Sequence, residues 1–182
     1  MMKHDNIRKL TVMAMLVAVS VILVWLIHLP LFPTAAFLEY DPADIPILVG
    51  TFAYGPVAGL LLTLAASAIQ ALTVSAQSGL YGFLMHVIST SLLSVTAGII
   101  YRFRRTRVGA AVALVAGTLA MGFGMLLANH FITPVFMGVP TAMVDGMLFT
   151  VFLPFNLIKA GLNALVTFLI YKPISSHLIK RN

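Results

Sequence analysis

The sequence predicts an all-α integral membrane protein with six transmembrane helices, both termini in the cytoplasm and a lid-like first outer loop. Of the 182 residues, 60% are hydrophobic and 9% are charged, and the mean hydropathy of +1.04 is typical of a membrane protein. Ten of the eleven Lys and Arg residues fall in clusters at 3–9, 102–107 and 172–181. The uncharged stretches between them can cross a bilayer at about 20 residues per helix. We therefore expect residues 1–182 to form a single six-helix membrane domain.

Composition also excludes several classes of protein. The net charge of +6 would suit nucleic-acid binding, but basic clusters that flank apolar runs indicate membrane topology instead. The chain contains no cysteine, so disulfide and thiol chemistry are absent. The first apolar run has no small-residue cleavage site followed by a soluble domain, so we expect a retained helix and not a signal peptide.

The first expected helix covers about residues 8–29. Ala14 and Ala18 form a pair of small residues four positions apart, which allows close approach of another helix. That neighbour can be part of this chain or another subunit, and the pair alone does not distinguish them. The connector 30–44 then holds three prolines and three of the five acidic residues. Long connectors are often functional, so it is either an ordered cap or a solvated outer loop.

Residues 45–101 contain no Asp, Glu, Lys or Arg, and they are too long for two helices. Gly55-Pro56 and the S-A-Q-S-G run at 75–79 interrupt them. An even number of crossings must separate the basic clusters on either side, because both clusters should face the cytoplasm. The expected spans within residues 45–101 are therefore about 45–54, 56–73 and 79–101. With the first helix, they make four crossings between the two clusters.

Two further helices complete the prediction. The helix at about 108–133 carries small residues on one face, at Ala113, Gly117, Ala120, Gly124 and Ala128, which favours close packing. An outer loop, 134–145, leads to the last helix at about 146–171, which Pro154 is expected to bend. The three outer connectors are residues 30–44, 74–78 and 134–145. They lack Lys and Arg and carry four of the five acidic residues.

Lys159 is the one charge inside the last span. A lysine near the bilayer centre costs about 2.5–3.5 kcal/mol on insertion scales, so it needs an internal partner or a ligand. Asn156, Lys159 and Asn163 lie on one face of a helix, and together they suit an oriented polar solute. If Lys159 contacts a ligand, its removal should weaken binding by about 1.5–3 kcal/mol and change folding little.

Other polar residues at membrane depth are Gln70, His86, Asn129 and His130. Asn129 and Asn156 are expected to converge below the outer loops, and each histidine can be functional or simply packed. Neither histidine stands in a metal-binding motif, so no metal site is predicted. The sequence has no nucleophile elbow, no phosphate loop and no carboxylate pair within a span. We therefore expect neither an enzyme nor a resident cofactor.

Four motifs resemble one known family. They are L-E-Y-D-P-A-D-I-P at 38–46, Y-G-P-V-A-G at 54–59, L-P-F-N-L-I-K at 153–159 and L-I-Y-K-P at 169–173. With the six-helix layout, the chain resembles the substrate-binding subunits (S components) of energy-coupling factor vitamin transporters, most closely the riboflavin-specific type.

The resemblance implies capture of a vitamin from outside a prokaryotic cell, in a pocket closed by the first outer loop. It implies partners in the cell membrane, namely a transmembrane coupling subunit and two ATPases. The implied flavin contacts are Asn129, Asn156 and Lys159, and the lid carries Tyr40 and Asp41. Ala14 and Ala18 match the motif that docks on the coupling subunit.

The chain departs from better-known riboflavin members. It has Thr63, Ala66 and Ser67 where they have a Glu…Lys-Asn set, and it has His86 and Glu39 where they have Asn and often Lys. These departures leave the vitamin open, and we count His86 among the ligand-binding candidates. Apolar walls for a planar ring are expected from Phe152, Phe155, Tyr81 and Met85. Two alternatives remain: an S component for another vitamin, and a structural or accessory membrane protein whose Lys159 bonds Asn129.

Overall fold

A computed structural model describes residues 2–32, 35 and 37–178 of the chain. Lys180 and Arg181 of the last basic cluster lie outside the described residues. The elements in order are α1 (Met2–Leu26), β1 (Leu29–Pro30), β2 (Glu39–Tyr40), α2 (Asp44–Tyr54), α3 (Pro56–Leu72), the 3₁₀ turn η2 (Ala76–Ser78), α4 (Gly79–Phe103), α5 (Arg107–Met137), α6 (Thr141–Asp145), the π-helical turn η3 (Leu148–Phe152) and α7 (Leu153–Leu178).

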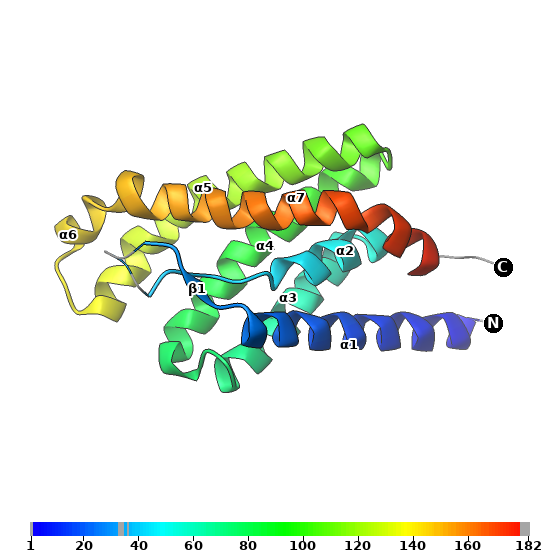
Figure 1. Cartoon of the computed structure of the whole chain (residues 1–182), viewed down its shortest axis with the longest axis horizontal. Coiled ribbons are helices and arrows are strands. Elements are labelled where there is room, and N and C mark those ends of the chain that lie inside the picture. Colours follow the sequence, from blue (N-terminus) through cyan, green and yellow to red (C-terminus); the bar gives the residue numbers. More distant parts are fainter. Residues whose placement is uncertain (1, 33–34, 36, 179–182) are drawn as a thin grey trace.

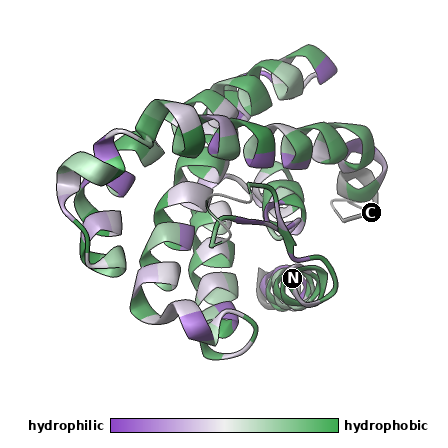
Figure 2. Cartoon of the chain, turned by 60° about the vertical axis from the view of Figure 1, so that its left-hand side comes forward, coloured by the Kyte–Doolittle hydropathy of each residue, from purple (hydrophilic) through white to green (hydrophobic). Residues whose placement is uncertain are grey.

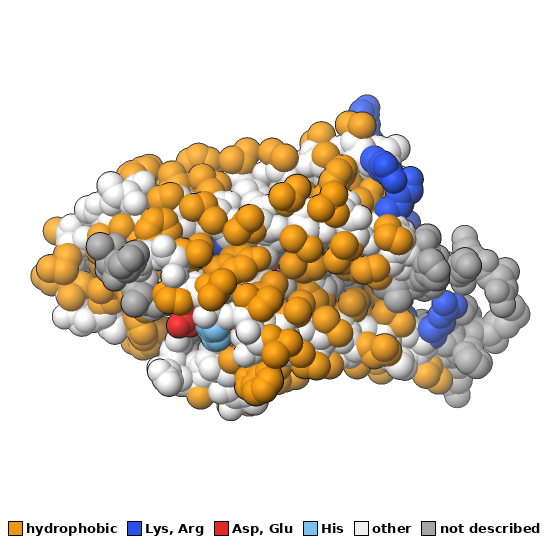
Figure 3. Space-filling model, viewed as in Figure 1, with side chains coloured by type: hydrophobic (Ala, Val, Ile, Leu, Met, Phe, Trp, Pro, Cys, Tyr) orange, Lys and Arg blue, Asp and Glu red, His pale blue; other side chains and the backbone are white. Residues whose placement is uncertain are grey.

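Within the described part of the chain, four helices are long and apolar enough to cross a membrane: Asn6–Leu26, Ala76–Phe103, Arg107–Met137 and Leu148–Ile174. The helix ribbons are mostly hydrophobic along their length, with only short hydrophilic stretches (Figure 2). Hydrophobic side chains cover the long sides of the face seen in Figure 3, whereas most of its Lys and Arg side chains gather at one end. This exterior fits a lipid environment.

Helix α2 has only eleven residues, and ten of them are buried. It contacts α1, α3, α4 and α7 (Figure 1). A helix surrounded by protein buries its apolar side chains against neighbouring helices, so it does not need the length of a lipid-facing span. Its Leu48, Val49 and Phe52 join the main core cluster, while Ile47 packs with Val17 of α1.

The small residues of α5 allow it to lie close to α4. A Cβ atom added to Gly117 would come 2.7 Å from the backbone oxygen of Leu93, and one added to Gly124 would come 2.5 Å from Leu92. Both distances are shorter than van der Waals contact, so a larger residue at Gly117 would push the backbones apart and one at Gly124 would displace the Leu92 side chain. The close packing expected for this face is therefore confirmed at these two positions.

Several helix bounds differ from those expected. Helix α1 ends at Leu26, before the predicted 29, and a short antiparallel β1–β2 pair follows. Helix α5 runs on through Pro134 to Met137. The expected last helix is divided, because the N–H of Phe152 bonds the carbonyl of Met147 five residues back. Pro154 falls in the first turn of α7, where a missing N–H costs little.

Candidate functional site

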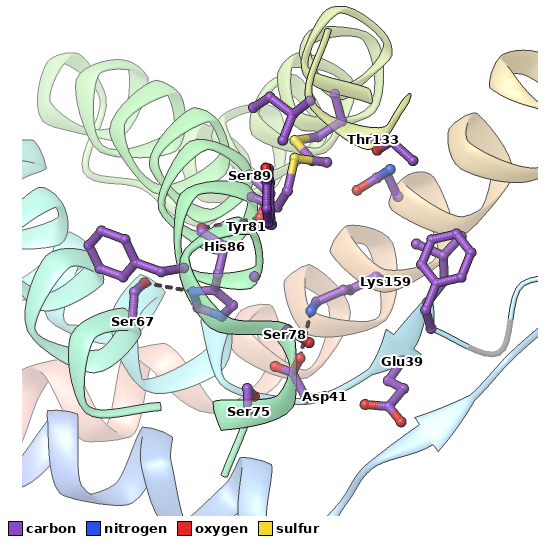
Figure 4. A pocket seen from close by; sticks show the side chains of 18 of the residues that line it. Glu39, Asp41, Ser67, Ser75, Ser78, Tyr81, His86, Ser89, Thr133 and Lys159 are labelled. Carbon is purple, nitrogen blue, oxygen red and sulfur yellow. Dashed lines mark hydrogen bonds and ion pairs between the residues drawn. The ribbon is translucent and has the colours of Figure 1, made fainter. Parts of the chain in front are cut away.

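The segment between α1 and α2 crosses one end of the helix bundle as a small hairpin. Leu29 pairs with Tyr40 and Pro30 with Glu39 in its two antiparallel strands. At the base of the hairpin, His28 Nε2 lies 2.6 Å from Glu39 Oε2. These contacts hold β2 beside the end of α1, so that Asp41, the next residue, points into the protein (Figure 4).

Lys159 has a carboxylate partner. Its Nζ donates a hydrogen bond of 2.6 Å to Asp41 Oδ2, and each side chain is 9% exposed. Burial would raise the pKa of Asp41, but the Lys159 ammonium and the Ala43 N–H lower it, and the attraction prevails. The alternative in which Lys159 bonds Asn129 is wrong, because Asn129 bonds residues of its own helix.

Asn163 ties the same segment to α7 without lining the cavity described below. Its Nδ2 donates to the Asp41 carbonyl at 3.1 Å and to Asp44 Oδ2 at 2.9 Å. Its Oδ1 accepts from the Tyr40 hydroxyl at 3.0 Å. Asp44 Oδ1 in turn accepts from Thr90 of α4 at 2.6 Å. Asn163 therefore holds the segment around the site in place. Of the three residues expected on one helix face, only Asn156 and Lys159 line the cavity.

A cavity lies beneath this segment, between α3, α4, α5 and α7 (Figure 4). Five of the six predicted ligand-binding residues line it: Asp41, His86, Asn129, Asn156 and Lys159. Tyr40 does not, since its hydroxyl is engaged by Asn163. Three of the four predicted wall residues also line it: Tyr81, Met85 and Phe155. Phe152 is fully buried and packs against Phe37.

The two asparagine amides are held in place by their own helices. Asn129 Nδ2 donates to the Met125 carbonyl at 2.7 Å, and its Oδ1 accepts from Thr133 at 2.8 Å. Asn156 Nδ2 donates to the Phe152 carbonyl at 2.8 Å. Each amide nitrogen carries a second hydrogen, and each amide oxygen a second lone pair. These groups are therefore preorganised to bind a polar ligand.

The two histidines have different surroundings. His86 lines the cavity, and its Nδ1 lies 2.7 Å from the Ser67 hydroxyl. His130 instead lies 2.5 Å from Asp145, joining α5 to α6 outside the cavity. The chain after α5 turns back and brings Asp145 beside His130, a contact that the sequence did not indicate. The described residues contain no group of three potential metal ligands.

Some residues that line the cavity were not among the predicted ligand-binding residues. Ser67 and Gln70 of α3 and Thr133 of α5 are buried polar residues at its edge. Gln70 was noticeable as a polar residue within a long uncharged stretch, but its direction could not be known. On α1, both Ala14 and Ala18 are exposed, so their small side chains are free to meet a partner.

Comparisons with known proteins identify the family of the chain. A model of the family "ECF transporter, substrate-specific component" matches residues 8–171. The chain is 28% identical to the riboflavin transporter FmnP of Bacillus subtilis (strain 168), covering 91% of both proteins. It is 26% identical to the riboflavin transporter RibU of Staphylococcus aureus (strain TCH60), covering 94% of this chain and 92% of that one.

A solved structure has the same fold. It is described as the S component of a bacterial ECF transporter, and it superposes with a TM-score of 0.81 at 24% identity, covering 96% of this chain and 99% of that one. The family is a substrate-specific transporter component and not an enzyme. From its matched length and its fold, the chain belongs to the family of substrate-specific components of ECF transporters.

Proposed function

We propose that this chain captures riboflavin, or a closely related flavin, from outside the cell and presents it for ATP-driven uptake by partner subunits. The observation that carries the proposal is the cavity that combines the Asn129 and Asn156 amides with the Lys159–Asp41 pair. The similarity of the chain to two riboflavin transporters also supports it.

A flavin ring is planar and apolar, with carbonyl and nitrogen groups along one edge. Small-molecule sites typically place a few polar groups within apolar walls. Here Tyr81, Met85 and Phe155 supply apolar surface, and the amides of Asn129 and Asn156 supply donors and acceptors on the α5–α7 side. These residues are the proposed ring contacts, and Lys159 is the proposed charged donor beside them.

The proposed topology has six crossings, with both termini and the α4–α5 connection in the cytoplasm. The connection between α4 and α5, which contains Arg104 and Arg105, lies at the same end of the molecule as the start of α1 and the end of α7 (Figure 1). Basic residues favour the cytoplasmic side of a membrane. The β1–β2 hairpin, η2 and α6 lie toward the opposite end (Figure 1). In the proposed topology, the cavity would therefore lie in the outer half of the membrane.

The hairpin segment is the proposed lid of the cavity. Asp41 belongs to this segment and lines the cavity, while its carboxylate bonds Lys159 and its backbone carbonyl bonds Asn163. Opening the cavity by moving the hairpin would break these two contacts and the one from Tyr40 to Asn163. The hairpin contacts are therefore suited to hold a closed state.

Energy for uptake must come from other subunits, because the sequence has no phosphate-binding loop. We propose a transmembrane coupling subunit and two ATPases as partners in the prokaryotic cell membrane. Ala14 and Ala18 form the proposed docking surface, since they are exposed on α1. A small-residue pair allows two helices to approach closely without displacing bulky side chains.

Two alternatives are favoured by particular observations. His86 and Ser67 face each other where better-known riboflavin members differ, which favours a different vitamin as the solute. The Lys159–Asp41 pair is complete within the chain, which favours a structural role for Lys159. Both alternatives predict that the protein does not bind riboflavin.

The test is titration of riboflavin into the purified protein in detergent, followed by quenching of flavin fluorescence. We expect saturable quenching and a yellow preparation when cells are grown with riboflavin. Thiamine, added first in excess, is the control and should not prevent the quenching. A colourless protein that gives no quenching would contradict the proposal.

A further inference from the structure

The cavity has a second polar corner on the side of α3 and α4. Gln70 is 3% exposed and lines the cavity, and its Nε2 has no hydrogen-bond partner among the described residues. His86, from the neighbouring helix, also lines the cavity, and its Nε2 is likewise buried without a partner in the described chain. A buried polar atom left unpaired costs about 1–3 kcal/mol, so each calls for an explanation.

Ser67 fixes the orientation of the His86 ring. Its Nδ1 lies 2.7 Å from Ser67 Oγ, and Ser67 is 1% exposed. Because one ring nitrogen is engaged by Ser67, the other is left for a group in the cavity. Figure 4 shows Ser67 and His86 on one wall and Lys159 on another. The corner is built by α3 and α4, whereas the Asn129 and Asn156 amides come from α5 and α7.

Chemistry identifies the group that fits this corner. The Gln70 Nε2 atom only donates, whereas the His86 Nε2 atom donates or accepts according to its tautomer. A hydroxyl group both donates and accepts, so it can satisfy the two nitrogens in either case. The corner made by Ser67, Gln70 and His86 contains no Lys or Arg side chain to pair with a phosphate or carboxylate.

We propose that Gln70 and His86 form the subsite for a hydroxylated, uncharged chain of the bound solute, with Ser67 positioning His86. This inference rests on the proposed flavin binding and divides the cavity into two parts. The α5–α7 side holds the ring, and the α3–α4 corner holds the hydroxyl groups of the chain attached to it. Gln70 and His86 then determine specificity for that chain.

The experiment compares riboflavin with lumiflavin, which has the same ring but a methyl group in place of the hydroxylated chain. Both are titrated by fluorescence quenching into the full-length protein and its Gln70→Met variant. We expect the riboflavin Kd to rise about 3- to 10-fold, the range for one lost hydrogen bond. The lumiflavin Kd should change less than about 2-fold, because lumiflavin has no chain to bind.

Two further variants provide an independent test and a control. His86→Met carries the same test independently if Gln70→Met does not fold. Ser91→Ala is the matched control, because Ser91 Oγ is also buried without a partner among the described atoms but lies outside the cavity lining. It should leave the Kd of both flavins unchanged.

The possible failures are distinguishable. If the parent protein binds both flavins but Gln70→Met and His86→Met change the two Kd values by the same factor, or change neither, the subsite is wrong and flavin binding stands. Equal affinity of the parent protein for riboflavin and lumiflavin would also overturn the subsite. If the parent protein binds no flavin, the proposed function and the subsite both fail.

Discussion

The ammonium of Lys159 lies 2.6 Å from the carboxylate of Asp41, across 118 residues of sequence. One residue belongs to α7 and the other to the segment between β2 and α2. This single contact neutralises the only described Lys or Arg side chain that is buried, and it also holds the proposed lid against the bundle. Stability and closure of the cavity are therefore coupled through one pair.

Lys159→Met should lower the stability of the ligand-free protein by about 3–5 kcal/mol, because it leaves Asp41 charged, buried and unpaired. The sequence alone suggested little effect on folding, but it did not reveal this partner. The measurement is the melting temperature in detergent. Adding Asp41→Asn should recover much of the loss, since it removes the carboxylate that lost its partner, while Asp44 keeps its hydrogen bonds from Thr90 and Asn163. Lys172→Met, at an exposed position, is the control and should change stability by less than about 0.5 kcal/mol. An unchanged melting temperature for Lys159→Met would contradict the coupling.

Topology is testable with single cysteines, because the chain has none of its own. Gln77 in η2 and Arg105 between α4 and α5 are both exposed. A membrane-impermeant maleimide should label Gln77→Cys in intact cells and Arg105→Cys only after permeabilisation. Labelling of both from the same side would show that α4 does not cross the membrane and would refute the six-helix count.

Ala14→Trp should abolish uptake in cells, because a bulky ring on this surface keeps a partner helix away. The purified variant should bind its solute with the affinity of the parent protein. Val19→Trp is the matched control on the same helix, since Val19 is 45% exposed but is not part of the small-residue pair. Uptake by Ala14→Trp at the rate of the control would remove Ala14 from the docking surface. Loss of solute binding would show that this face of α1 packs within the chain.

Gly117→Ala should lower stability by about 1–3 kcal/mol, the usual cost of overpacking, because its Cβ would meet the Leu93 carbonyl at 2.7 Å. Gly161→Ala is the control within α7, where a Cβ would have no other atom within 4 Å. There the same change should leave the melting temperature unchanged or raise it, because alanine favours a helix by about 1 kcal/mol over glycine. Equal effects of the two changes would show that the α4–α5 approach does not depend on Gly117.

Much of the fold was predictable because the free energy of placing a residue in lipid is largely a local property. Long uncharged runs, Gly55-Pro56 and the three basic clusters indicated where helices lie and which connections share a side. Irregular backbone was harder to foresee. The π-helical turn before α7 and the extension of α5 beyond Pro134 depend on packing in the folded chain, and no single residue type marks them.

The site shows the same division. The sequence by itself determined that Lys159 is buried deeply enough to need a partner, and that Asn156 shares its face, because both follow from helix period and charge burial. Only the tertiary structure decided that Asp41 is that partner, that Asn163 binds Tyr40 and Asp44, and that Gln70 lines the cavity. These outcomes depend on how helices distant in sequence are rotated and aligned, since a small rotation of α3 or α7 would exchange a cavity-facing residue for a packed one.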